Sequence, residues 1–123
     1  DLKYLHRGGR VSKTAAIAGS ILGIKPLLHV DNEGHLIPVG KIRGRKQSIE
    51  KLVDMMCERM GNWDNSTVAV CHGDCLSDAE YAADLMRKKL GKKTTVHICY
   101  TGAVIGSHSG PGTLALFCMG DQR

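Results

Sequence analysis

TVAVCHGDCLSDAEYAADLMRKKLGKKTTVHIC, residues 67–99, is the stretch that decides the class of fold. Its two ends, Thr67–Cys71 and Thr94–Cys99, have the apolar or alternating character of β-strands. Between them, five residues recur at helical spacing: Ala79, Ala82, Ala83, Met86 and Leu90. Ser77 and Glu80 form a capping-box pair that predicts the start of this helix, and Gly91 predicts its end. An amphipathic helix needs a sheet face to cover, so we predict a mixed α/β fold.

Other stretches predict further elements. A second amphipathic helix ends at Gly61 and has one apolar face, made by Ile49, Leu52, Val53, Met56 and Met60. A first helix is predicted from about Ser12 to Leu22, with Gly23 as its stop.

Two strands, Lys25–Val30 and residues 35–39 (HLIPV), flank the turn signal Asp31–Gly34 and predict a hairpin, in which Pro38 favours an edge. A last apolar strand is expected at Thr113–Met119. We therefore expect one domain over residues 1–123, α/β or α+β, with a central mixed sheet of about five strands and about three flanking helices.

The composition is that of a globular domain, with 42% hydrophobic and 24% charged residues among 123. No apolar run approaches the ~20 residues that cross a bilayer, so no transmembrane segment is expected. The first residues, DLKYLHRGGR, lack the apolar core of a signal peptide. Five cysteines, an odd and scattered set, favour reduced thiols in a cytoplasmic protein.

The charge balance favours anionic partners. Lysine and arginine exceed aspartate and glutamate by 17 − 12 = 5. Nucleic acid, phosphates, carboxylates and acidic protein surfaces all fit such a balance. Aromatic residues are only 4% of the chain, so a base-stacking surface has few candidates.

Two basic loops are candidate anion sites. Gly8–Arg10 (GGR) precedes the predicted first helix, where glycines let backbone N–H groups meet an anion, although a tight turn with a surface arginine is the simpler alternative. GKIRGRKQS, residues 40–48, places four cations directly before a helix: Lys41, Arg43, Arg45 and Lys46. Guanidinium groups and a helix dipole together suit a phosphate, whereas a solvated basic face is the simpler alternative.

VIGSHSGPG, residues 104–112, is a glycine-rich loop with a histidine in its middle. His108, Ser107 and Ser109 offer an imidazole and two hydroxyls, all able to hydrogen-bond a carboxylate or phosphate. Val104 and Ile105 add an apolar wall, so the loop suits an amphiphile. The alternative is a turn between strands with an incidental histidine.

CHGDC, residues 71–75, carries weaker signals. A zinc site would need a second pair of ligands, and none is obvious, so no metal and no cofactor is expected. A nucleophile made from Cys71 or Cys75 with a histidine has no supporting local sequence.

Three segments together resemble the DegV family of bacterial fatty-acid-binding proteins: LKYLHRGGRVSK (residues 2–13), GSILGIKPLLHVDNEGHLIPVGKIRGRK (19–46) and VIGSHSGPGTLALFC (104–118). They occur in the family's order and cover nearly the whole chain. The family has two domains, and this chain resembles the C-terminal one, so an N-terminal domain is expected to be missing from it.

The resemblance implies a carrier of a long-chain fatty acid, not an enzyme. It implies that His108 contributes to carboxylate binding near a domain junction, with Ser107 and Ser109 beside it and Ile105 touching the acyl chain. Some family members present the fatty acid to a kinase for phospholipid synthesis. By position, Arg43 is the first candidate for contact with phosphate or with such a partner, followed by Arg45, Lys46 and Arg10. A domain that carries only one wall of the fatty-acid site exposes apolar surface, so the isolated domain could also form a homodimer.

Two other classes of function remain open at the level of sequence. A basic nucleic-acid-binding module would fit the charge, but no recognisable motif supports it, and we expect no nucleic-acid partner. A hydrolase could use His108 with Ser107 or Ser109, but only Asp74 and Asp121 are nominal candidates for its orienting carboxylate.

Overall fold

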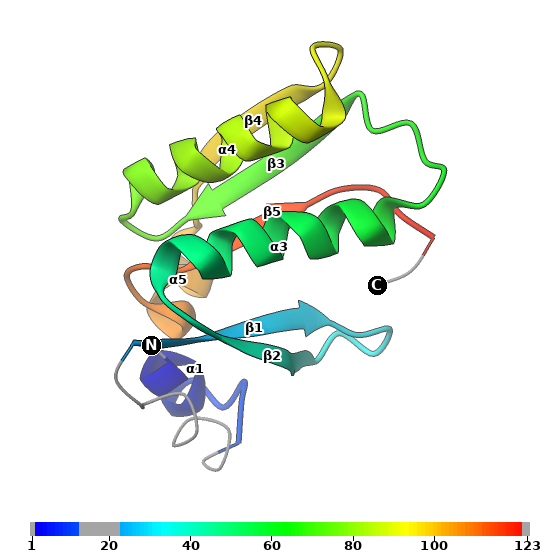
Figure 1. Cartoon of the computed structure of the whole chain (residues 1–123). Helices are drawn as coiled ribbons and strands as arrows, with labels where there is room; N and C mark the ends of the chain where they lie inside the picture. Colours follow the sequence, from blue (N-terminus) through cyan, green and yellow to red (C-terminus); the bar gives the residue numbers. More distant parts are fainter. Residues whose placement is uncertain (1, 13–22, 122–123) are drawn as a thin grey trace.

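The computed structural model describes residues 2–12 and 23–121 (Figure 1). Within these ranges the helices are α1 (Leu2–Arg7), α3 (Arg45–Met60), α4 (Leu76–Leu90) and α5 (Ala103–Ser109). The strands are β1 (Ile24–Val30), β2 (Leu36–Arg43), β3 (Thr67–His72), β4 (Thr95–Tyr100) and β5 (Leu114–Phe117). None of the described helices combines the length and the apolar character needed to cross a membrane. The helix predicted from Ser12 to Leu22 lies, apart from Ser12, outside the described residues.

The main core lies between a three-stranded sheet and two helices. The strand order is β4-β3-β5, in which β3 pairs parallel to β4 and antiparallel to β5. Figure 1 shows α4 over β3 and β4, and α3 over β5. The side chains between these layers form one buried cluster: Ile49, Val53, Met56, Met60, Val68, Val70, Ala79, Ala82, Ala83 and Met86. The helical faces that the sequence predicts are therefore the buried faces.

The mixed α/β class is confirmed, but the single central sheet is wrong. The five strands divide into the three-stranded sheet and a separate antiparallel hairpin of β1 and β2. The hairpin packs against α3, which also contacts β5 of the three-stranded sheet. Pro38, which has no N–H to donate, sits where the hairpin register shifts between Leu27 and Leu28.

The predicted start of one helix also needs correction. The helix expected to open at Ser77 begins at Leu76, with Cys75 as its N-cap and no side-chain cap, so the predicted capping box does not form. Gly61 and Gly91 are the C-caps of α3 and α4, as predicted.

The stretch that we predicted as a glycine loop is partly helical. Residues 103–109 form α5, which is bounded by Gly102 and by Gly110 at φ 79°. Only one glycine, Gly106, lies inside the helix, where it costs about 1 kcal/mol relative to alanine. The glycines of this segment therefore mainly delimit a short helix.

Arg45 joins three separate elements at one end of the core. Its Nε donates to Asp78 Oδ2 on α4 at 2.8 Å, and its Nη2 donates to the carbonyl of Gly112 at 2.8 Å. Arg45 itself is in the first turn of α3. One guanidinium therefore fixes the starts of α3 and α4 relative to the loop before β5.

Met86→Ala should destabilise the protein by about 2–5 kcal/mol, because Met86 is fully buried and the truncation leaves a cavity. Met119→Ala, at a position 56% exposed, is the matched control and should cost under about 1 kcal/mol. Urea unfolding measures both. Equal losses would show that the core lies elsewhere.

Arg45→Gln should cost about 1 kcal/mol, because a partly exposed ion pair and a hydrogen bond to Gly112 are lost together. A double-mutant cycle with Asp78→Asn measures the coupling between the two side chains. Arg43→Gln on exposed β2 is the control and should leave the free energy of unfolding unchanged. A coupling free energy of zero between Arg45 and Asp78 would show that Arg45 does not hold α3 to α4.

Candidate functional site

The two candidate loops GGR and SHSGPG meet where α1 packs on α5 (Figure 1). A methyl group on Gly8 would collide with the His108 imidazole, and one on Gly110 would collide with the ring of Tyr4. Both glycines therefore allow a close approach of the two helices. Sequence reasoning missed Tyr4 and the contact of Gly8 with His108, because both depend on packing between segments a hundred residues apart in the chain.

His108 lies half-buried in the last turn of α5. No described residue forms a hydrogen bond or ion pair with its imidazole. Nδ1 lies against Gly8, so Nε2 is the ring nitrogen that is left for a ligand.

The two serines beside His108 are engaged with the backbone of their own helix. Ser107 Oγ donates to the carbonyl of Val104 at 2.7 Å, and Ser109 Oγ donates to the carbonyl of Ile105 at 2.8 Å. A hydroxyl has only one proton, so neither can donate to a carboxylate without giving up its bond in the helix. Ser107 is exposed and can make that exchange, whereas Ser109 is buried.

Apolar side chains are exposed at the start of α5. Val104 is 71% exposed and Ile105 is 61% exposed. Ile105 and His108 are three residues apart on the helix and so lie on one face. Just before the helix, Thr101 Oγ1 is buried with no hydrogen-bond partner among the described residues. The segment thus presents an apolar surface next to a polar group.

The predicted basic loop is not one loop. Lys41 and Arg43 belong to β2, Gly44 is the N-cap of α3, and Arg45 and Lys46 begin that helix. Lys46 lies over the ring of Tyr81, with Nζ 5.0 Å from the ring centroid. Because Arg45 is held by Asp78 and Gly112, it is less available to an anion than Arg43, whose side chain is exposed and has no ion-pair or hydrogen-bond partner among the described residues.

Arg10 lies in the GGR segment and is exposed. Its Nη1 donates to the carbonyl of Gly8 at 2.6 Å. Gly8 thus has the Arg10 guanidinium on its carbonyl and the His108 imidazole against its Cα. The fold brings these two predicted site residues together, while Arg43 and Lys46 lie on β2 and α3.

The cysteine and histidine of CHGDC do not form a nucleophilic pair. Buried His72 uses Nδ1 to accept the backbone N–H of Cys75 at 3.2 Å, and the Cys75 thiol donates to the carbonyl of Thr113. Burial raises the pKa of the Cys75 thiol, so the thiol stays protonated at neutral pH. The pair is therefore part of the local packing.

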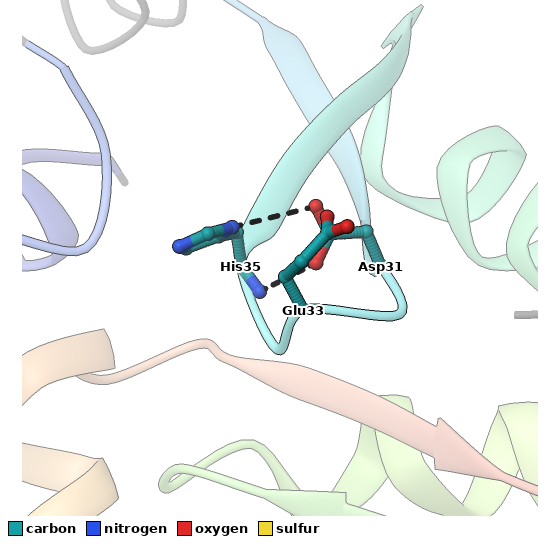
Figure 2. Close-up of side chains that lie close together, drawn as sticks. All are labelled: Asp31, Glu33 and His35. Carbon is teal, nitrogen blue, oxygen red and sulfur yellow. Dashed lines mark hydrogen bonds and ion pairs between the residues drawn. The ribbon is translucent and has the colours of Figure 1, made fainter.

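One exposed group has the side-chain types of a metal site: Asp31, Glu33 and His35, at the tip of the β1–β2 hairpin (Figure 2). Asp31 accepts the backbone N–H of His35 at 2.7 Å, and His35 Nδ1 lies 3.5 Å from the other carboxylate oxygen. The His35 backbone N–H is the main cause that lowers the pKa of Asp31. These contacts close the turn and account for the proximity of the carboxylate and the imidazole.

Comparison with known proteins gives a consistent result. Residues 1–121 match the sequence model of the DegV family, which is described as a family of uncharacterised proteins. A DegV domain-containing protein of Clostridium perfringens is 45% identical over all of this chain, which covers 42% of that protein. The chain thus spans about two fifths of the length of the curated relatives it matches.

Solved structures agree with the fold. A fatty-acid-binding DegV family protein from Streptococcus agalactiae has a TM-score of 0.81 and 32% identity, over 94% of this chain and 40% of that one. A DegV family protein from Eubacterium eligens, loaded with heptadecanoic acid, has a TM-score of 0.84 and 27% identity, over 98% of this chain and 43% of that one. The match of nearly every residue to the family, together with these folds, shows that the chain belongs to the DegV family.

Proposed function

We propose that this chain forms part of a cytoplasmic carrier that binds a long-chain fatty acid, with the carboxylate at His108 and the acyl chain along Ile105. One observation carries the proposal: an imidazole without a described partner lies on the same helix face as an exposed isoleucine. The fatty acid bound in the E. eligens relative and the name of the S. agalactiae relative support the class of ligand.

Elementary energetics fit an amphiphile at this place. Removing an acyl chain from water gains roughly 0.8 kcal/mol per CH₂, so about ten methylenes supply most of the affinity. The carboxylate is costly to desolvate unless donors meet it. His108 offers a donor on the same face of α5 as Ile105, and the Arg10 guanidinium, which donates to the carbonyl of Gly8, adds positive charge near that glycine.

The remainder of the site belongs to structure outside this chain. The exposed start of α5 has no cover among the described residues, and the chain spans about two fifths of its relatives. We propose that an N-terminal domain supplies the second wall, so that the fatty acid lies at a domain junction. Alternatively, two copies of the isolated chain associate through the exposed apolar start of α5, so that each copy covers this surface of the other.

Presentation of the fatty acid to a kinase is a further part of the proposal. Arg43 and Lys46 are exposed at the junction of β2 and α3, where the first turn of the helix has no acidic residue. A positive surface next to a helix N-terminus suits an acyl phosphate or an acidic partner. Arg45 is better explained as the residue that holds α3 to α4.

A carrier fits the described residues better than a hydrolase does. A serine nucleophile must donate its hydroxyl proton to the histidine, which in turn needs an orienting carboxylate. The hydroxyls of Ser107 and Ser109 donate to helix carbonyls instead, and Asp121 accepts the indole N–H of Trp63.

His108→Ala should weaken fatty-acid binding by about tenfold in the full-length protein, because the carboxylate loses a charge-assisted hydrogen bond. Isothermal titration with a long-chain fatty acid measures the affinity. Ser107→Ala is the matched control and should change it by less than about threefold, because its hydroxyl is already bonded within the helix. Unchanged affinity of His108→Ala would remove this residue from the site.

Ile105→Ser should weaken binding more for long acyl chains than for short ones, because the side chain contributes apolar contact along the chain. The same titration with fatty acids of increasing length gives the slope of binding free energy per methylene. Val39→Ser on exposed β2 is the control for the loss of surface apolar area. Parallel slopes for both variants and the wild type would contradict contact of Ile105 with the acyl chain.

A further inference from the structure

Two cysteines face each other across the parallel strand pair. Cys71 of β3 and Cys99 of β4 are register partners, so their side chains leave the sheet on the same face. Their sulfur atoms are 2.6 Å apart. Closing a disulfide requires only about a further 0.5 Å of approach, since a disulfide S–S bond is about 2.05 Å long. Register partners on neighbouring strands also have the Cα separation that a disulfide needs.

The pair is on the side of the sheet that α3 and α4 do not cover. Val68 and Val70 point into the core, and Cys71 alternates with them on the opposite face. Cys99 is exposed, and Cys71 is half-buried. A small oxidant in solution therefore reaches Cys99 directly.

We propose that Cys71 and Cys99 are a redox modification site at which a peroxide closes a reversible disulfide between β3 and β4. The Cys99 sulfur attacks one peroxide oxygen and the O–O bond breaks; the proton of the Cys99 thiol goes to the released hydroxide, which gives a sulfenic acid and one water. The Cys71 sulfur then attacks the sulfenic sulfur; its proton leaves with the hydroxyl as the second water. Both thiols are oxidised by one electron each, and the peroxide takes up the two electrons.

The order of the two steps follows from the surroundings of each sulfur. Burial, and the hydrogen bond with Cys99, raise the pKa of Cys71 to about 11, so Cys71 is protonated at neutral pH. A protonated thiol is a poor first nucleophile. Cys71 is instead held against the sulfur that has already reacted, where its proximity compensates for its low thiolate fraction.

The crosslink would close a loop that contains all of α4. The two cysteines are 28 positions apart, and the intervening chain includes Leu76–Leu90. Tyr100 and the residues that lead into α5 follow Cys99 directly. Oxidation would therefore fix the strand from which α5 departs and restrict the unfolded chain.

The test is mild oxidation of the purified chain with hydrogen peroxide, followed by thiol titration and intact mass. The chain has five free thiols, and we expect three after oxidation, together with a loss of two hydrogen atoms in mass. A digest that cuts before Asp74 and Asp78 and after Tyr100 places Cys71, Cys75, Cys99 and Cys118 on four different peptides. The Cys71 and Cys99 peptides should be joined and should separate again with dithiothreitol. The midpoint of thermal unfolding should rise by roughly 5–10 °C on oxidation.

Two variants make the result specific. Cys57→Ser/Cys75→Ser/Cys118→Ser keeps only the proposed pair and should lose both remaining thiols to a monomeric disulfide. Cys99→Ser, at an exposed position, should keep its circular dichroism spectrum and show no crosslink and no rise in melting temperature. The proposal would be overturned if, in the wild-type chain, Cys99 were oxidised to a sulfinic acid while Cys71 remained a free thiol. A disulfide between any other two cysteines would also overturn it.

Discussion

Three fully buried alanines on α4 set the spacing on which this fold depends. Ala79, Ala82 and Ala83 have no side chain beyond Cβ, so the helix can lie close to both the sheet and α3. Val70 and Met86 fill the remaining space without exposure to solvent. Larger residues at the alanine positions would push α4 outward, and overpacking of this kind typically costs about 1–3 kcal/mol.

The position of the site follows from the parallel pairing that α4 makes possible. Parallel strands bring their carboxyl ends to the same edge of the sheet, and β3 and β4 end there at His72 and Tyr100. Gly73, directly after β3, exchanges backbone hydrogen bonds with Gly112 and Thr113 at 2.6 and 2.9 Å. Thus the loop after α5 is tied to the end of β3, and α5 presents His108 and Ile105 at the edge where open α/β sheets bind ligands.

The sequence predicts the elements whose periodicity is strong. The helices ending at Gly61 and Gly91, the strands of the 67–99 stretch and the hairpin around Asp31–Gly34 occur within a few residues of their expected places. A period of two or 3.6 shows which face is apolar, but it does not show which strand lies next to which, so the division into two sheets could not be predicted. The short helices α1 and α5 were not predicted, because six or seven residues make too few turns to show a helical period in the sequence.

The candidate site shows the same limit. His108 and its neighbours are evident from the motif, and the amphiphile interpretation needs only the order of polar and apolar residues. The close contact of Gly8 with His108 and the hydrogen bonds of Arg45 to Asp78 and Gly112 arise from tertiary packing, so the sequence alone does not predict them. By position in the sequence, Arg43 is the first candidate, followed by Arg45 and Lys46. The contacts show that Arg45 is held by Gly112 and that Lys46 lies over the ring of Tyr81.

The most direct test of a fatty-acid carrier is to identify what the full-length protein retains through purification. Extraction into organic solvent followed by mass spectrometry should find a long-chain fatty acid in near-stoichiometric amount, because a buried acyl chain dissociates slowly. A preparation that contains nucleic acid and no fatty acid would contradict the account.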